Sequence, residues 1–306
     1  ETTLPIWWHF TTDLLAEGVH FDLKSAAPRS IGYRAAIANL SDLAAMGATP
    51  RYLLISLAIP KQVSQSHIYD FYRGLMKACR PYGVTLIGGD TSASQTGLFL
   101  SITLIGTTTR RRALFRHGAK VGDLIYVSGT LGDSLAGCRL LAEDTPRRSS
   151  EKNRSPFSRF HRQFLIRRHL YPTARIAEGQ WLNTGRLASA AIDLSDGLSG
   201  DLRHICEESG VGAEVESDNL PLSPACRAYA KARGVSPVQL AITGGEDYEL
   251  LFTVSPKSHH RLERQAKAHG YRMTHIGTIH PRRFGIQMTT QGHTQPLPQT
   301  SYEHFR

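Results

Sequence analysis

Short apolar runs alternate with amphipathic stretches along this chain, which is the pattern of a protein that mixes strands and helices. Nearly continuous apolar runs predict strands, and apolar residues at a 3/4 spacing predict helices. The first strands are expected at residues 6–12, 52–59, 84–87 and 98–107, and the first helices at residues 31–46 and 65–82. A junction between domains is expected at residues 110–122.

The same alternation begins again after this junction. Strands are expected at residues 123–128, 190–194, 212–216, 248–254 and 274–279, and helices at residues 132–141, 198–209, 222–233 and 258–270. The pattern therefore predicts a mixed α/β fold of two domains of unequal size. We expect an N-terminal domain over residues 1–111 and a larger C-terminal α/β domain over residues 112–306.

Positive charge adds the expectation of an anionic partner. The 306 residues include 36 Lys and Arg against 26 Asp and Glu, which gives a formal net charge of +10. A Ser- and Pro-containing stretch from Arg147 to Arg168 carries much of this charge, and we expect it to be an exposed loop or the start of a helix. No nucleic-acid-binding motif accompanies the charge, so a nucleotide or a phosphorylated metabolite is favoured over nucleic acid.

Cysteine spacing and apolar content indicate the cellular setting. The four cysteines form no C-x-x-C pair, so we expect buried, reduced thiols in a cytoplasmic protein. The longest apolar runs, at residues 53–60 and 98–105, are far shorter than the ~20 residues that cross a bilayer. We therefore expect no membrane partner.

Four short acidic segments share one arrangement, in which an apolar strand or an Ala-rich helix leads to an aspartate among small residues. They are Thr11-Thr12-Asp13, Asn39-Leu40-Ser41-Asp42, Gly88-Gly89-Asp90-Thr91 and Asp193-Leu194-Ser195-Asp196-Gly197. Carboxylate oxygens are the ligands that Mg²⁺ takes together with substrate phosphates. Glycines allow a polyphosphate to approach the backbone closely, and helix starts favour the same anions.

Each of these segments alone is more simply a helix cap or a tight turn. Their combination is more informative, because several carboxylates converge only when cations offset their repulsion. The chain has no P-loop, nucleophile elbow, zinc-protease, protein-kinase or dinucleotide-binding fingerprint. The residues therefore favour a magnesium-assisted reaction of phosphorylated compounds.

Taken in order, these segments and their neighbours resemble the thiamine-monophosphate kinase family, from about residue 11 to residue 305. The aspartate-rich segments are shared by a wider superfamily of ATP enzymes similar to aminoimidazole-ribonucleotide synthetase. More specific to the kinase family are E-G-V-H-F from Glu17, G-G-E-D-Y-E-L from Gly244, and the terminal Tyr302-Glu303-His304-Phe305.

The resemblance implies the two-domain fold of that superfamily and ATP-dependent phosphorylation of thiamine phosphate to thiamine diphosphate. It implies direct transfer without a phosphoenzyme, several Mg²⁺ ions, ATP as co-substrate, and a homodimer that joins the first domains edge to edge. The implied metal ligands are Thr11, Thr12, Asp13, Asp42, Asp90, Asp193 and Asp196. The implied ATP contacts are Gly89, Asp90, Arg116 and Ser195, and the implied thiamine phosphate contacts are His20, Glu246 and Tyr302.

The chain departs from the family at its beginning. Family members carry a Gly-Asp-Asp-Ala segment well before the position of Asp13, whereas this chain opens with Glu1-Thr2-Thr3-Leu4-Pro5. We therefore expect the leading part of the first domain, with its metal-binding carboxylates, to be missing. Two alternatives stay open: another ATP-dependent enzyme of the same superfamily, or a truncated, inactive protein that binds nucleotides or nucleic acid.

Overall fold

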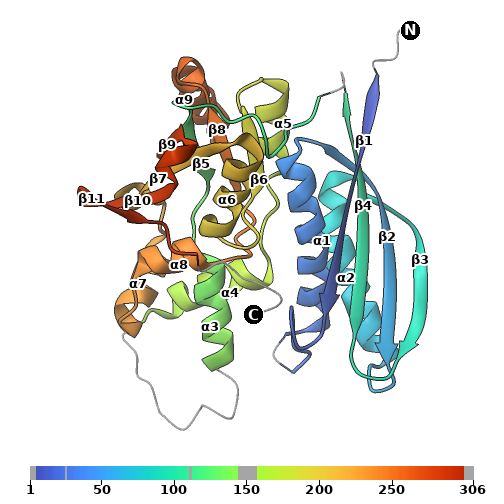
Figure 1. The fold of residues 1–306 in the computed structure, drawn as a ribbon. Coiled ribbons are helices and arrows are strands. Elements are labelled where there is room, and N and C mark those ends of the chain that lie inside the picture. The colour runs from blue at the N-terminus through green and yellow to red at the C-terminus, as the bar shows by residue number, and fades with distance from the viewer. Residues whose placement is uncertain (1–4, 25, 110–111, 144–156, 300–306) are drawn as a thin grey trace.

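The structure, a computed structural model, describes residues 5–24, 26–109, 112–143 and 157–299. In these ranges, an N-terminal unit and a C-terminal unit each combine a sheet with helices, and helix α1 (Pro28–Ala45) lies where the two units meet (Figure 1). This is the mixed α/β architecture that the alternating pattern predicts. None of the helices in these ranges combines the length and the apolar character needed to cross a bilayer.

The N-terminal unit is a four-stranded sheet with two helices on one face. Its strands follow the order β1-β4-β2-β3, in which β2 and β3 are parallel and the other neighbours are antiparallel. Besides α1, its elements are β1 (Ile6–Ala16), β2 (Thr49–Pro60), α2 (Gln65–Cys79), β3 (Thr85–Ser94) and β4 (Phe99–Thr109). Within the described chain, the outer strands β1 and β3 each pair with one neighbour, so each presents an unpaired edge.

The C-terminal unit is a seven-stranded mixed sheet with helices around it, in the strand order β11-β10-β7-β9-β5-β8-β6. Its strands are β5 (Leu124–Ser128), β6 (Ala190–Asp193), β7 (Val211–Glu216), β8 (Leu250–Val254), β9 (Met273–Pro281), β10 (Ile286–Thr290) and β11 (His293–Pro296). Its helices are α3 (Asp133–Glu143), α4 (Arg159–Leu170), α5 (Ile176–Thr184), α6 (Leu198–Ser209), α7 (Pro224–Arg233), α8 (Pro237–Thr243) and α9 (His259–His269).

Helix α1 is buried on most of its surface because elements of both units cover it. It packs against α2, β1 and β4 of its own unit and against α5 and β6 of the C-terminal unit. Ile31, Leu40 and Leu43 are at most 2% exposed. A helix that is apolar around most of its circumference is typical of such an enclosed position. Beyond the exposed first turn, which carries Arg29, a polar side chain on α1 therefore lies in the core or at the junction of the two units.

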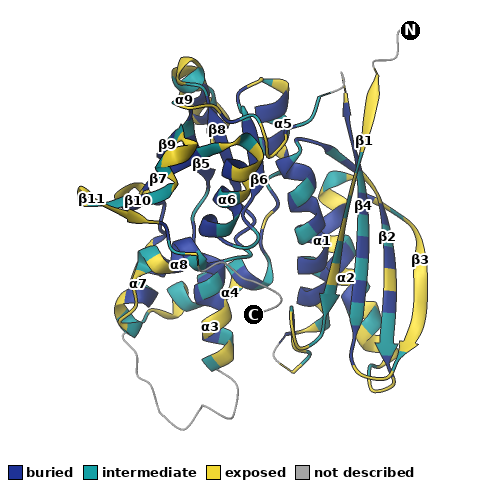
Figure 2. Cartoon of the chain, viewed as in Figure 1, coloured by how far each residue is buried: buried dark blue, intermediate teal, exposed yellow. Residues whose placement is uncertain are grey.

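Strand β1 carries a stripe of apolar side chains that face solvent on the outer side of the N-terminal sheet. Ile6, Trp8, Phe10 and Leu14 alternate along β1 with inward-facing residues and are between 53% and 66% exposed. Figure 2 shows β1 and β3 as largely exposed strands. An exposed apolar stripe of this kind is typical of a surface that another molecule covers.

The structure corrects several predicted elements, while the other predicted strands and helices are present with shifted ends. β1 continues to Ala16 and β3 to Ser94, so Asp13 and Gly88–Thr91 lie inside strands and not at strand ends. Pairing with β4 and β2 extends these strands beyond their apolar cores. The pattern does not predict α4, α5, α8, β10 or β11.

The basic stretch from Arg147 to Arg168 is not simply a solvated surface. Residues 144–156 lie outside the described residues, and most of the remainder forms α4. Leu165 and His169 of this helix are buried. Arg168 is also largely buried and lies 2.9 Å from Glu249. Part of the predicted surface charge is therefore internal.

Candidate active site

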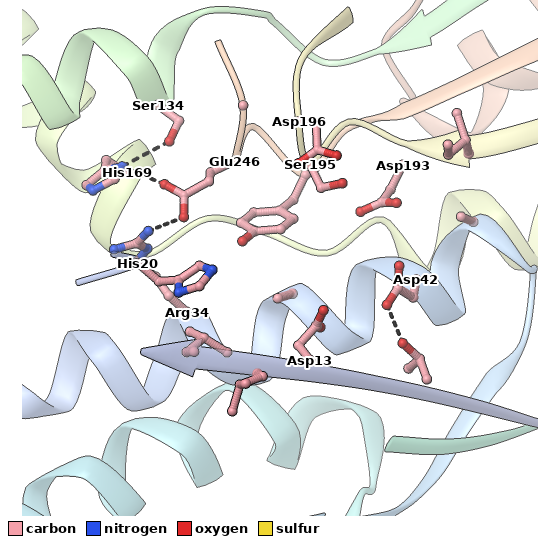
Figure 3. Close-up of a pocket in the computed structure, with 18 of the residues that line it drawn as sticks. Asp13, His20, Arg34, Asp42, Ser134, His169, Asp193, Ser195, Asp196 and Glu246 are labelled. Atoms are coloured by element: carbon pink, nitrogen blue, oxygen red, sulfur yellow. Dashed lines mark hydrogen bonds and ion pairs between the residues drawn. The ribbon is translucent and has the colours of Figure 1, made fainter. Parts of the chain in front are cut away.

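A cavity of about 1560 Å³ lies between the N-terminal unit and the loops of the C-terminal unit. Both units line it, because β1 and α1 form one wall while α3, the β6 end and the Gly245–Tyr248 segment form another (Figure 3). Most of the predicted site residues line this one cavity. They are Thr11, Thr12, Asp13, His20, Asp42, Arg116, Asp193, Ser195, Asp196 and Glu246.

Four aspartates in this cavity come from three separate parts of the fold. Asp13 lies on β1, Asp42 on α1, and Asp193 and Asp196 at and just after the end of β6. The Thr11 hydroxyl donates a hydrogen bond to Asp42 Oδ2, which holds β1 and α1 together at this point. In Figure 3 the labelled carboxylates from both walls face the same space. The convergence expected of Asp13, Asp42, Asp193 and Asp196 is therefore present.

Burial and mutual repulsion change the acidity of this cluster. Burial, together with the charges of Asp42 and Asp196, raises the pKa of Asp13 to about 7. Burial also raises the pKa of Asp193, and the charges of Asp42 and Asp13 add to this effect. Raised pKa values in a cluster of carboxylates mean that too little positive charge lies nearby to stabilise the ionised forms.

The cluster also has oxygens that no protein group satisfies. Oδ2 of Asp13 and Oδ2 of Asp193 are buried, and in the described part of the chain neither has a hydrogen-bond partner. Leaving a buried acceptor unsatisfied costs free energy, so such oxygens indicate a missing ligand. Hard oxygen donors with net negative charge fit Mg²⁺.

Two loops of the C-terminal unit pair closely to form the wall that carries Ser195 and Glu246. The backbone N–H of Glu246 donates to the Ser195 carbonyl at 2.9 Å, and that of Tyr248 donates to the Leu194 carbonyl at 3.0 Å. Glu246 and Tyr248 both have positive backbone φ angles, 62° and 52°, which residues other than glycine rarely adopt. Local strain of this kind is found at functional sites, where the surrounding structure holds it in place.

Arg34 on α1 was not predicted, yet it forms an ion pair with Glu246 inside the cavity. Arg34 is 6% exposed, and the same Glu246 lies 3.5 Å from Nδ1 of His169. Ser134 in turn lies 3.0 Å from this His169 nitrogen. Figure 3 shows the four side chains as one connected group. The available sequence signal was an arginine in the middle of an Ala-rich helix, one turn before the Asn39–Asp42 segment.

Buried charges behind the cavity hold this wall in place. Glu249 is fully buried, and both Arg175 and Arg168 donate hydrogen bonds to it, at 2.6 and 2.9 Å. The carboxylate of Asp247 accepts from the backbone N–H groups of Gly132 and Ser134, at 2.6 and 2.9 Å. The acidic residues after Glu246 are therefore structural supports, and they tie α3 and α4 to the loop that carries Glu246.

Two predicted residues that the structure describes do not line this cavity. Gly89 and Asp90 lie on β3 and line a separate, smaller cavity of about 220 Å³ with Ile55 and Tyr72. Gly89 has a φ of 156°, and a Cβ atom there would lie 1.7 Å from the Ile55 carbonyl oxygen, so only glycine fits. Tyr302 lies outside the described residues.

The expectation of buried thiols is correct for three of the four cysteines. Cys79, Cys206 and Cys226 are buried and free. Cys138 is also free, but it is exposed and lines the large cavity. Its position on α3, facing the cavity, explains the difference.

Known proteins with this arrangement identify the family. The domain family described as "AIR synthase related protein, N-terminal domain" matches residues 5–108, and "AIR synthase related protein, C-terminal domain" matches residues 120–288. The chain is 42% identical over 243 residues to a thiamine-monophosphate kinase of Aquifex aeolicus (strain VF5), which is 79% of this chain and 74% of that protein. It is 39% identical over 298 residues to that of Escherichia coli (strain K12), which is 96% of this chain and 86% of that protein.

A solved structure agrees with these sequence matches. The structure of AaThiL complexed with AMPPCP and TMP is 36% identical, has a TM-score of 0.82, and is matched over 97% of this chain and 87% of that chain. With two AIR synthase related domains and this degree of identity along most of its length, the chain belongs to the thiamine-monophosphate kinase family.

Proposed function

We propose that this protein transfers a phosphoryl group from ATP to thiamine phosphate and so forms thiamine diphosphate. The observation that carries this proposal is the meeting of Asp13, Asp42, Asp193 and Asp196 in one large cavity. A reaction between two phosphorylated compounds brings many negative oxygens together, so its main requirements are positioning and charge neutralisation. The likeness to AaThiL complexed with AMPPCP and TMP supports both substrates.

The four aspartates, with the hydroxyls of Thr11 and Thr12, would hold Mg²⁺ ions. Bound Mg²⁺ supplies charge neutralisation for the donor and acceptor phosphates. The protein's own part is to keep the carboxylates fixed, which the Thr11–Asp42 hydrogen bond and the paired loops at Ser195 do. Arg116, an exposed residue at the cavity, and Ser195 would contact ATP.

The acceptor would bind at the other end of the cavity, near His20 and Glu246. His20 is held in place because its Nδ1 accepts a hydrogen bond from the backbone N–H of Ala16, at 3.0 Å. Glu246 is held by Arg34 and offers a carboxylate that suits the aminopyrimidine of thiamine. The predicted contact of Tyr302 with the thiamine rings remains a prediction.

A homodimer would explain why Asp90 lies outside the large cavity. In the described chain, the N-terminal sheet has two unpaired edges, β1 and β3, and an exposed apolar stripe along β1. In a two-fold dimer, β1 of each subunit would pair with β3 of the other, so that neither strand keeps an unpaired edge. The same contact would cover the apolar stripe of β1. Asp90 of the partner subunit would then lie beside the strand that carries Asp13.

Replacing Trp8 with glutamate is expected to convert the dimer to a monomer and to abolish phosphoryl transfer. Trp8 is 53% exposed on the outer face, so a charge there opposes burial in a dimer without disturbing the core. Light scattering after gel filtration measures the mass. Tyr69→Glu is the matched control, because Tyr69 is 61% exposed on α2, away from this face. A Trp8→Glu variant that stays dimeric would contradict a contact through this strand, and a monomeric wild type with full activity would contradict the dimer.

An ADP-release assay tests the activity itself. With ATP and Mg²⁺, we expect ADP release with thiamine phosphate and none with unphosphorylated thiamine or an aminoimidazole precursor, and thiamine diphosphate as the product. ADP release with the aminoimidazole precursor instead would indicate another enzyme of the superfamily. Absence of turnover together with steeply salt-dependent binding to random oligonucleotides would indicate a nucleic-acid-binding protein.

A further inference from the structure

A second group of metal-ligating side chains lies on the C-terminal unit, outside the large cavity. His259, His260 and Glu263 lie at the start of α9, and one ligand atom of each is within 4.8 Å of those of the other two. None of the three lines the large cavity. In Figure 1, α9 lies at the outer end of its unit, away from α1 and the N-terminal sheet.

The donor atoms have a spacing that suits a tetrahedral ion. Nε2 of His259 lies 3.5 Å from Oε2 of Glu263. Two ligands that bind one zinc ion at about 2.0–2.1 Å lie about 3.4 Å apart in a tetrahedron. The rings of His259 and His260 have centroids 4.9 Å apart, so the second imidazole reaches the same place.

A buried tyrosine positions the first of these ligands. The Tyr126 hydroxyl lies 2.5 Å from Nδ1 of His259, while Tyr126 itself is 1% exposed and stacks on Phe252. A histidine that binds a metal through one ring nitrogen usually has its other nitrogen hydrogen-bonded, which fixes the ring and its tautomer. Tyr126 leaves Nε2 of His259 directed toward Glu263.

We propose that His259, His260 and Glu263 form a second cation site, which takes Zn²⁺ rather than Mg²⁺. Imidazole nitrogens suit Zn²⁺ and similar transition-metal ions, whereas Mg²⁺ prefers oxygen ligands alone. Three protein ligands leave the fourth position to water, and the Glu263 side chain is 53% exposed on that side. Bound zinc would fasten the first turn of α9 to β5 through Tyr126.

Zinc titration calorimetry on the full chain tests this site, with melting temperatures measured in parallel. Excess Mg²⁺ occupies the aspartates of the large cavity, and a Cys138→Ser background removes the exposed thiol, which would itself bind zinc. His260→Gln and Glu263→Gln each remove one ligand. His204→Gln is the matched control, because His204 is also an exposed histidine on a helix of this unit.

The background protein and the His204→Gln variant should bind zinc saturably and melt at a higher temperature when zinc is present. His260→Gln and Glu263→Gln should lose both effects, and Tyr126→Phe should weaken binding by about tenfold or more. Zinc binding of equal affinity in all the variants would overturn the proposal, as would the absence of binding in the background protein.

Discussion

Replacing Asp193 with asparagine is expected to lower phosphoryl transfer by at least about 100-fold in a protein that stays folded. Asp193 is 3% exposed at the end of β6, where it faces the carboxylates of Asp13 and Asp42. Asparagine keeps the shape of the side chain but removes its charge, so the site would hold Mg²⁺ less tightly. ADP release at saturating ATP and thiamine phosphate measures the loss, and added Mg²⁺ should restore part of it.

The same substitution should make the Mg²⁺-free protein more stable at alkaline pH. Burial and neighbouring charges raise the pKa of Asp13 to about 7 and also raise that of Asp193, so both carboxyls bind protons more tightly in the folded state. The stability that they contribute is full below their unfolded pKa and is lost as the pH rises through about 7 for Asp13 and about 8 for Asp193. A neutral amide at position 193 removes one charge from the cluster and reduces that loss. Melting temperatures with a chelator at about pH 6 and about pH 8 measure the effect.

Asp133→Asn is the matched control for this pair of results. Asp133 is also fully buried, but it lies outside the large cavity and accepts hydrogen bonds from Ser223 and Thr130, each at 2.5 Å. Its oxygens are therefore hydrogen-bonded within the protein, and weakening these bonds should lower stability while turnover per folded molecule is kept. Turnover near that of the wild type in Asp193→Asn would contradict the metal-binding site, and so would a loss of stability like that of Asp133→Asn.

The aspartates could be predicted because local sequence places them. Asp193 directly follows an apolar run, and Asp42 lies on an Ala-rich helix. The spacing of apolar residues and the local composition were therefore enough to place both aspartates on their elements. Charge repulsion then supplied the reason to expect cations between them. None of this required knowledge of how the two units pack.

The other parts of the site depend on contacts between distant segments. The Gly88-Gly89-Asp90 segment has the composition of a turn, but it pairs with β2 along β3, where the close approach to Ile55 requires Gly89. The partner of Arg34 is 212 residues away in the sequence. The internal role of Arg168 depends on Glu249, which belongs to another element. Composition and periodicity do not encode pairings of this kind.

Replacing Arg34 with methionine is expected to raise KM for thiamine phosphate by about 10- to 100-fold and to leave KM for ATP nearly unchanged. Burial lowers the pKa of His169 to about 4, so this ring is neutral at physiological pH and does not supply charge to Glu246. Among the described residues, Arg34 is then the cation paired with Glu246. Without it, Glu246 would move out of the position in which it meets the acceptor.

Two further variants separate positioning from folding. Arg34→Lys keeps a positive charge near Glu246 and should recover part of the affinity for thiamine phosphate. Arg29→Met removes an arginine from the same helix, but its side chain is 48% exposed and paired with Asp70, so both KM values should stay unchanged. Equal increases in both KM values in Arg34→Met would contradict a role at the acceptor end. An unchanged KM for thiamine phosphate would mean that Glu246 needs no partner, because the strained backbone at its positive φ angle would then be enough to hold it.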